Sequence, residues 1–200
     1  MRGTGRAIAF AAAAAASLAA GAGWGEEMRR IRTSEDGHGF VLEDGTPFFW
    51  LGDTAWTLFQ QSEKDIEFYL ADRAERGFNV IQCMVLRTIL PENKDLTPCH
   101  SGALPFASFE PLQFNEAYFA HIDFIVNCAA RHGLRVAMAA MWGSNAATMF
   151  RDPERDNYSY ARFLAERYKD RPNVIWIASG VAALAVAVGL SLRMRWNSPR

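Results

Sequence analysis

The chain has little net charge and few cysteines. Its 200 residues hold 21 Lys and Arg against 22 Asp and Glu, for a formal net charge of −1. This balance argues against a nucleic-acid-binding protein that works by neutralising phosphates. The three cysteines, Cys83, Cys99 and Cys128, are widely spaced and odd in number. They predict neither a disulfide scaffold nor a metal knuckle, and at most one bridge.

Two further patterns are missing. No metal-ligand spacing links the histidines, cysteines and acids, so we expect no metal site and no cofactor. The segment after the first expected strand, 52–56, lacks a glycine-rich phosphate fingerprint, which disfavours a nucleotide-binding fold. What the chain does have is apolar material: half of its residues are hydrophobic, with 6 Trp, 5 Tyr and 14 Phe. Such a chain fills a globular core and is not disordered.

The amino-terminal end differs from the middle of the chain. Arg2 and Arg6 precede an uncharged, alanine-rich run over 7–20, and Ala20-Gly21-Ala22 has the small residues that signal peptidase accepts. This order predicts a signal peptide over residues 1–22 and an exported protein, periplasmic or extracellular.

The carboxyl-terminal end fits two structures. Residues 174–192 carry no charge and Arg193 and Arg195 follow, which is the pattern of a membrane anchor with its basic side in the cytoplasm. The first part of this stretch, 173–179, also has the pattern of a buried parallel strand. If that strand belongs to the globular domain, an apolar tail over 181–200 remains.

The middle of the chain repeats strands and helices. Asp44-Gly45 between apolar runs predicts a hairpin that leads into a first core strand ending at Gly52-Asp53. Helices are expected after Ser62, Asn115 and Asn157, each with apolar residues on one face. Further strands are expected over 78–86, 134–141 and 173–179. Four strands alternating with three helices predict an α/β fold with a parallel sheet, of the (β/α)8 TIM-barrel type but with only about four strand-helix units.

Candidate site residues lie toward the carboxyl ends of the strands or just after them, because parallel α/β folds bind ligands there. Aromatic rings that can stack on a sugar and polar groups that can bind its hydroxyls occur together there, which favours a carbohydrate as the partner. The candidates for substrate binding are Asp53, Trp56, Gln82, Trp142 and Asn145. Each has a structural alternative: core packing for the tryptophans, a turn cap for Asp53 and a backbone partner for Gln82.

The remaining polar candidates are weaker. His100 lies in a long Pro-, Ser- and Gly-rich insertion between Arg87 and Asn115, which fits either a binding loop or a disordered excursion. His121 and His132 lie on a helix or at its end and are expected at the surface.

Several long motifs of the sequence are similar to those of one protein family. They are EDGTPFFWLGDTAW (43–56), RGFNVIQ (76–82), NEAYFAHID (115–123), WG (142–143) and RFLAERYKDRPNVIW (162–176). In this order they closely resemble the apiosidase-like glycoside hydrolases, over residues 31–180. The resemblance implies a (β/α)8 barrel that removes a terminal sugar from plant cell-wall side chains such as those of pectin.

The resemblance also implies a missing catalytic group. In the family, the fourth strand runs into a segment whose acid is expected to be the general acid/base, and here that position is Val181. Glycoside hydrolysis ordinarily needs two carboxyl groups, and the second would come from a later strand. Asp53 is assigned to substrate positioning by its motif. We therefore expect no catalytic residue and no hydrolysis by the chain alone.

Three hypotheses remain open. The first is a truncated hydrolase whose tail over 181–200 is unrelated to the family. The second is a membrane-tethered, non-catalytic carbohydrate-binding module. The third is a homodimer in which two half barrels close one sheet.

Overall fold

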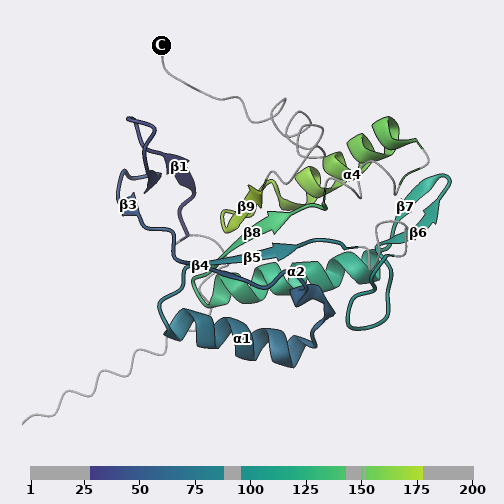
Figure 1. Cartoon of the computed structure of the whole chain (residues 1–200), viewed down its shortest axis with the longest axis horizontal. Coiled ribbons are helices and arrows are strands. Elements are labelled where there is room, and N and C mark those ends of the chain that lie inside the picture. The colour runs from purple at the N-terminus through teal and green to yellow at the C-terminus, as the bar shows by residue number, and fades with distance from the viewer. Residues whose placement is uncertain (1–27, 88–95, 143–149, 151, 178–200) are drawn as a thin grey trace, which may run out of the picture.

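A computed structural model describes residues 28–87, 96–142, 150 and 152–177 of the chain (Figure 1). Its central sheet is parallel and holds, in spatial order, β4 (Gly52–Thr54), β5 (Val80–Met84), β8 (Arg135–Ala139) and β9 (Val174–Ile177). Successive strands are joined through α1 (Glu63–Glu75), α2 (Glu116–Arg131) and α4 (Pro153–Tyr168). The predicted alternation of strands and helices, typical of part of a TIM barrel, is confirmed.

Two of the three helices begin where the sequence predicts. The Ser62 side chain accepts a hydrogen bond from the Asp65 amide at 3.1 Å, and the Asn115 side chain accepts one from the Ala117 amide at 3.1 Å. These side chains satisfy amides that have no partner within the helix. The start expected for the third helix, at Asn157, is wrong: α4 begins earlier, and Asp152 caps it. Its first residue is proline, which a first turn tolerates because the amide it lacks would be unpaired there.

The first core strand is shorter than predicted and lies later in the chain. The Asp44-Gly45 turn joins β2 (Phe40–Leu42) to β3 (Pro47–Phe48), as expected, with Gly45 at a φ of 85°. After β3 the chain leaves this small antiparallel sheet, and residues 49–51 belong to no strand before β4 begins. The Asn79 side chain spans these residues, donating to the Phe49 carbonyl at 2.6 Å and accepting from the Leu51 amide at 2.9 Å. Asp53 lies in the middle of β4 and not at its end, where the sequence predicted it.

The long insertion contains a hairpin that the sequence patterns did not predict. Within its described part, β6 (Phe106–Phe109) pairs with β7 (Leu112–Phe114) in antiparallel register. Phe106 is buried, and its ring lies 5.6 Å from that of Phe150 and 5.8 Å from that of Tyr160, centroid to centroid. The hairpin is thus held by aromatic packing against α4, which no local pattern shows.

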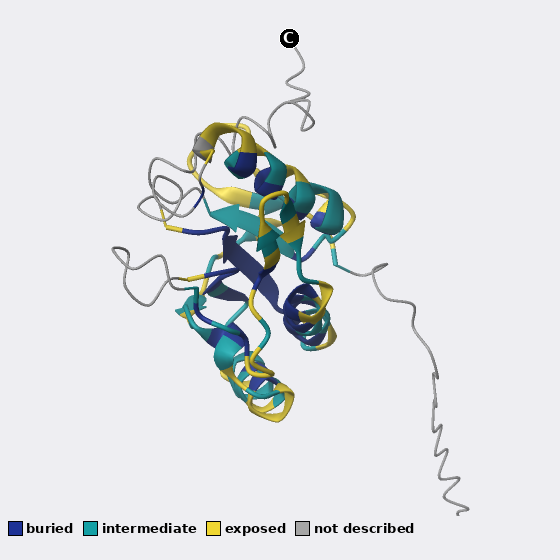
Figure 2. Cartoon of the chain, turned by 90° about the vertical axis from the view of Figure 1, so that its right-hand side faces the viewer, coloured by how far each residue is buried: buried dark blue, intermediate teal, exposed yellow. Residues whose placement is uncertain are grey.

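The core lies between the parallel sheet and its helices. Figure 2 shows buried residues concentrated in the strands and on the inner sides of the helices. At the amino-terminal end of the sheet, Arg135 ties in the amino-terminal segment: its guanidinium donates to the Arg29 carbonyl at 2.8 Å and lies 4.7 Å from the centroid of the Phe48 ring. The β1 (Ile31–Thr33), β2 and β3 strands are thereby joined to the sheet.

The structure bears on the expectations for the cysteines and, in part, on those for the two ends of the chain. Cys83, Cys99 and Cys128 are all buried with free thiols. No helix among the described residues is long and apolar enough to cross a bilayer. The predicted signal peptide and the apolar tail over 181–200 lie outside those residues.

Candidate functional site

Two tryptophans meet at the carboxyl-terminal edge of the sheet. Trp56 follows β4, and Trp142 follows β8, which is separated from β4 by β5. Their ring centroids lie 5.6 Å apart at an interplanar angle of 56°. Trp142 is 42% exposed, and Trp56 is half-buried. The pair therefore offers an aromatic surface at the edge where parallel α/β folds bind ligands.

Backbone and hydroxyl hydrogen bonds hold this edge in place. The Met84 amide donates to the Trp56 carbonyl at 3.2 Å, so Trp56 is tied to the end of β5. The Tyr160 hydroxyl, buried in α4, donates to the Ala140 carbonyl at 3.0 Å, two residues before Trp142. Both tryptophans thus extend from backbone whose position is set by neighbouring elements.

Gln82 lies in the middle of β5, beside a partner that sequence patterns missed. Its Nε2 donates to Thr54 Oγ1 at 3.2 Å, and the two residues are register partners in the sheet. Side chains of register partners point to the same face of a sheet, so Gln82 and Thr54 form one polar pair there. Thr54 is recognised as the partner of Gln82 only from the register of the sheet, which depends on how segments distant in sequence pair.

Asp53 points to the other face of the sheet. Its Oδ2 accepts hydrogen bonds from the Tyr69 hydroxyl at 3.0 Å and the Arg73 guanidinium at 3.1 Å, both on α1. Burial raises the pKa of this carboxyl, but hydrogen bonds from the Thr54 amide, Tyr69 and Arg73 outweigh it and hold the pKa below its usual range. Successive residues of a strand face opposite sides, so Asp53 is separated from Gln82 and Thr54. Asn145 and the Val181 position lie outside the described residues.

Two histidines are placed differently from expectation. His121, expected at the surface, is 9% exposed, and burial lowers its pKa. His132 follows α2, and its Nε2 lies 2.7 Å from Glu67 Oε1. Glu67 Oε2 also lies 2.9 Å from the Cys128 Sγ. The sequence showed no metal-ligand spacing, yet the fold brings three ligand-type side chains together; the separation of four residues between Cys128 and His132 on one helix was the available signal.

This cluster is electrostatically coupled. Hydrogen bonds from Cys128, His132 and Arg131 lower the pKa of Glu67 to about 2. Burial, together with the Glu67 carboxylate, raises the pKa of the Cys128 thiol to about 12. The cluster is therefore an ionised carboxylate surrounded by donors.

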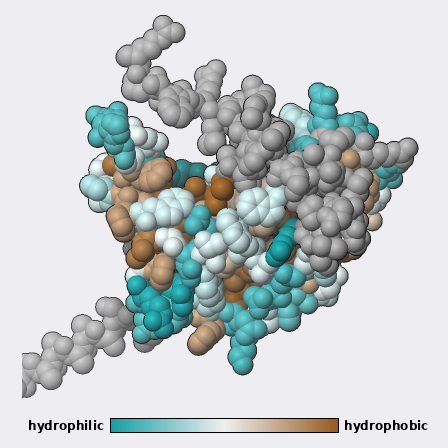
Figure 3. All heavy atoms as spheres, in the orientation of Figure 1, coloured by the Kyte–Doolittle hydropathy of each residue, from teal (hydrophilic) through white to brown (hydrophobic). Residues whose placement is uncertain are grey.

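A hollow of about 1160 Å³ runs beside β9, between the β1–β3 sheet and α4. Its lining combines aromatic and basic side chains, among them Phe40, Trp50, Tyr158 and Arg162. On this side of the molecule, Figure 3 shows apolar residues between the small sheet at the left and the strands of the parallel sheet.

Several solved structures share the fold of this chain. A glycoside hydrolase matches with 31% identity and a TM-score of 0.70, over 82% of this chain and 38% of its own. A glycoside hydrolase of family 5 from Bacteroides vulgatus matches with 28% identity and a TM-score of 0.68, over 82% of this chain and 36% of its own. A family 5 mannosidase from Rhizomucor miehei, at 14% identity and a TM-score of 0.58, has the same fold over 82% of this chain and 53% of its own. No curated protein matches the chain.

The fold is thus part of a glycoside hydrolase barrel, and the chain spans less than two fifths of the length of the first two of these structures. The model of the apiosidase-like catalytic domain matches residues 34–196. The chain belongs to the apiosidase-like family. The match continues beyond residue 180, where the resemblance of the motifs ends.

Proposed function

We propose that this chain binds the terminal sugars of pectic side chains at the Trp56–Trp142 pair and does not hydrolyse them by itself. The observation that carries the proposal is the close approach of the two rings at the carboxyl ends of β4 and β8, with Trp142 exposed. A sugar ring presents an apolar face that stacks on indole, and the family is one of glycoside hydrolases.

Polar groups next to this platform support a sugar as the ligand. The Gln82–Thr54 pair offers amide and hydroxyl groups to sugar hydroxyls from the strands beneath. Thr54 is exposed and Gln82 is half-buried, so both keep access to a ligand.

The state of Asp53 supports binding without hydrolysis. Glycoside hydrolysis ordinarily needs one carboxyl group that gives a proton to the leaving oxygen and a second that attacks or activates water. Asp53 is bound to Tyr69 and Arg73, and its lowered pKa keeps it ionised near neutral pH, so it does not supply the proton. The motif position expected for the general acid is Val181.

Export and membrane tethering extend this proposal. The signal-peptide pattern over 1–22 supports export, and the uncharged run that remains after β9, over 178–192, supports a tail that holds the outward-facing domain at the membrane. Cell fractionation tests this directly: the full chain is expected in the membrane fraction, and recovery of intact chain from the soluble cytosol contradicts it.

Isothermal titration with pectic oligosaccharides tests the binding. We expect saturable binding that Trp142→Ala weakens about fivefold, since one aromatic stacking contact is worth about 1 kcal/mol. Phe68→Ala, which removes an aromatic ring that is 76% exposed on α1, is the matched control and leaves binding unchanged. Absence of binding by the unaltered chain overturns the proposal.

An assay for released sugar tests the second half of the proposal. Purified chain incubated with the same oligosaccharides is expected to release none above the buffer control. Hydrolysis at a rate comparable with a full-length relative contradicts the proposed inactivity while leaving the binding site intact.

A further inference from the structure

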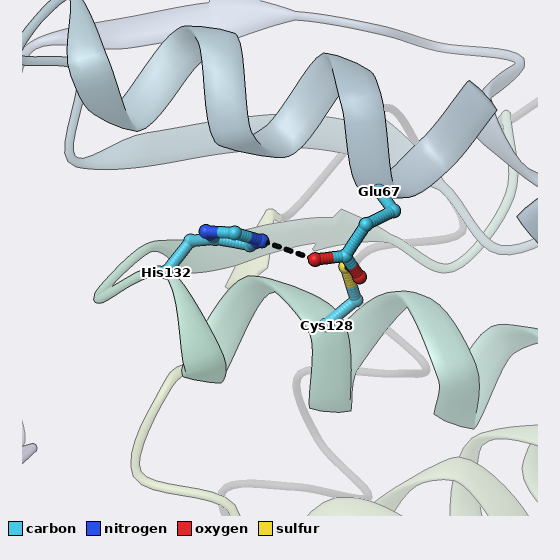
Figure 4. A group of neighbouring side chains, drawn as sticks. All are labelled: Glu67, Cys128 and His132. Carbon is cyan, nitrogen blue, oxygen red and sulfur yellow. Dashed lines mark hydrogen bonds and ion pairs between the residues drawn. The ribbon is translucent and has the colours of Figure 1, made fainter. Parts of the chain in front are cut away.

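Three side chains with different donor atoms meet between α1 and α2. Glu67 comes from α1, Cys128 from α2 and His132 from the position directly after α2, and all three point toward one another (Figure 4). Their ligand atoms lie within 4.8 Å of one another. Carboxylate oxygen, thiolate sulfur and imidazole nitrogen are the three donors that Zn²⁺ takes in proteins.

Helix geometry explains why the group converges. Residues four apart on an α-helix lie on the same face, one turn apart, so Cys128 and His132 present their side chains together. Helix α1 packs beside α2 and supplies Glu67 from the opposite side. The three donors are therefore positioned by two packed helices.

The spacing suits an ion of the size of Zn²⁺. Ligand bonds of about 2.3 Å to sulfur and about 2.0 Å to nitrogen and oxygen place tetrahedral donors roughly 3.5 Å apart. The present hydrogen-bond distances from Glu67, 2.7 Å to His132 and 2.9 Å to Cys128, are slightly shorter. An ion between the three needs only a small outward rotation of the side chains, and it replaces the two hydrogen bonds to Glu67 by coordinate bonds.

We propose that Glu67, Cys128 and His132 bind one divalent transition-metal ion, Zn²⁺ in the first place, that ties α1 to α2. Water completes a tetrahedral set, and the thiol proton passes to the solvent when sulfur coordinates. The Cys128 residue is buried, but the side chains of Glu67 and His132 are 43% and 25% exposed, so the ion has an entry from the solvent.

The position of the site makes its role structural. His132 follows α2 and precedes the start of β8, so the cluster lies at the amino-terminal end of the strands. Trp56 and Trp142 lie at the other end. In barrels of this kind the carboxyl-terminal face carries the chemistry and the opposite face contributes stability. The metal site and the sugar site are accordingly independent, and each is tested without the other.

Arg131 opposes the ion. Its guanidinium donates to Glu67 Oε2 at 2.5 Å, which orients the carboxylate but puts a positive charge beside the site. Arg131→Gln removes that charge, and we expect it to tighten binding roughly fivefold through the loss of like-charge repulsion. A cluster that only joins the helices by hydrogen bonds has no affinity to tighten.

Cobalt is the spectroscopic probe. Full chain, purified without a histidine tag and freed of metal, is titrated with Co²⁺. We expect the ultraviolet absorption of a cobalt–thiolate bond and the visible bands of a tetrahedral ion, saturating at one ion per chain and bleached by added Zn²⁺. No thiolate absorption at saturating Co²⁺ overturns the proposal.

Variants assign the ligands. Cys128→Ser is expected to abolish the thiolate absorption, and Cys99→Ser, a buried cysteine outside the cluster, is the matched control that retains it. Glu67→Gln, on the more exposed side of the site, keeps the thiol and is expected to weaken Co²⁺ binding at least tenfold, so the test does not depend on whether Cys128→Ser folds. Equal affinity in Glu67→Gln and unaltered chain overturns the assignment.

Thermal unfolding supplies a second readout. An ion that binds only the folded chain raises Tm, and at a hundredfold excess over Kd the rise is roughly 5 to 10 °C for a domain of this size. The full rise is expected with Zn²⁺ in unaltered chain and Cys99→Ser, and about half of it or less in Glu67→Gln, whose Kd is at least tenfold higher. An equal rise in all three contradicts a site at this cluster.

Discussion

The two ends of the parallel strands are held by different chemistry. At the carboxyl-terminal end, buried tyrosines bind the strand exits: Tyr118 donates to the Val85 carbonyl at 2.6 Å and Tyr160 to the Ala140 carbonyl at 3.0 Å. Their rings also fill the aromatic core. The Trp142 ring lies beside this aromatic packing but is 42% exposed, so a ligand can reach it from the solvent.

At the amino-terminal end, amides and charges replace the tyrosines. Asn79, just before β5, bonds the backbone at Phe49 and Leu51, and Asn173, just before β9, donates to the Val126 carbonyl at 2.9 Å. The Glu67 cluster adds charge-assisted bonds between helices. One end of the strands thus leaves a binding surface, whereas the other joins helices and strands to one another.

The largest effect is expected in the aromatic core of the carboxyl-terminal end. Phe106 is buried among four other rings, namely those of Phe109, Phe114, Phe150 and Tyr160. Phe106→Ala leaves a cavity there and is expected to lower the free energy of unfolding by about 4 kcal/mol, measured by urea denaturation. Phe68→Ala, on an exposed side chain, changes it by less than about 0.5 kcal/mol. Similar losses in both variants contradict the assignment of Phe106 to the core.

A smaller effect is expected from one hydroxyl. Tyr160→Phe leaves the buried Ala140 carbonyl without its donor, and we expect a loss of about 2 kcal/mol in urea denaturation. Because Ala140 precedes Trp142, sugar binding is expected to weaken as well. Tyr158→Phe, an exposed tyrosine on the same helix, is the matched control and changes neither quantity. An unchanged stability of Tyr160→Phe shows that the strand exit does not depend on this bond.

At the amino-terminal end the test is pH. Hydrogen bonds from Cys128, His132 and Arg131 lower the pKa of Glu67 from 4.5 to about 2, so its contribution to stability is complete above pH 4.5 and is lost as pH falls toward 2. Since the side chain is 43% exposed, we expect that contribution to be only about 1 kcal/mol.

The comparison is between unaltered chain and Glu67→Gln, unfolded with urea across this pH range in the presence of a metal chelator. The difference between them is expected to shrink as pH falls from 4.5. A difference that stays constant contradicts a role for the ionised carboxylate.

The smallest effect is expected at the surface of α1. Arg76 Nε lies 3.0 Å from Asp72 Oδ2, and the arginine side chain is 63% exposed. Arg76→Ala is expected to lower the stability slightly at low salt and by nothing measurable at high salt, because the solvent screens an exposed pair. Equal losses at both salt concentrations contradict an electrostatic origin.

Local signals explain which elements the sequence predicted well. Ser62 and Asn115 begin helices because their side chains bond amides within the next few residues, and the apolar strand of β5 is continuous in sequence. The start of α4 was missed although Asp152 is also a cap, because Asn157 five residues later is an equally good cap by type. The β6–β7 hairpin was missed because its partners, Phe150 and Tyr160, are distant in sequence.

The candidate site divides in the same way. The sequence alone determined that the chain is an α/β protein of the apiosidase-like family and that Trp56 and Trp142 follow strands, since periodicity and motifs are properties of neighbouring residues. Only in the folded chain do the two rings meet, does Asp53 turn toward α1 and does Glu67 reach Cys128 and His132. Those facts depend on strand register and helix packing, which join segments far apart in the chain and leave no local pattern to read.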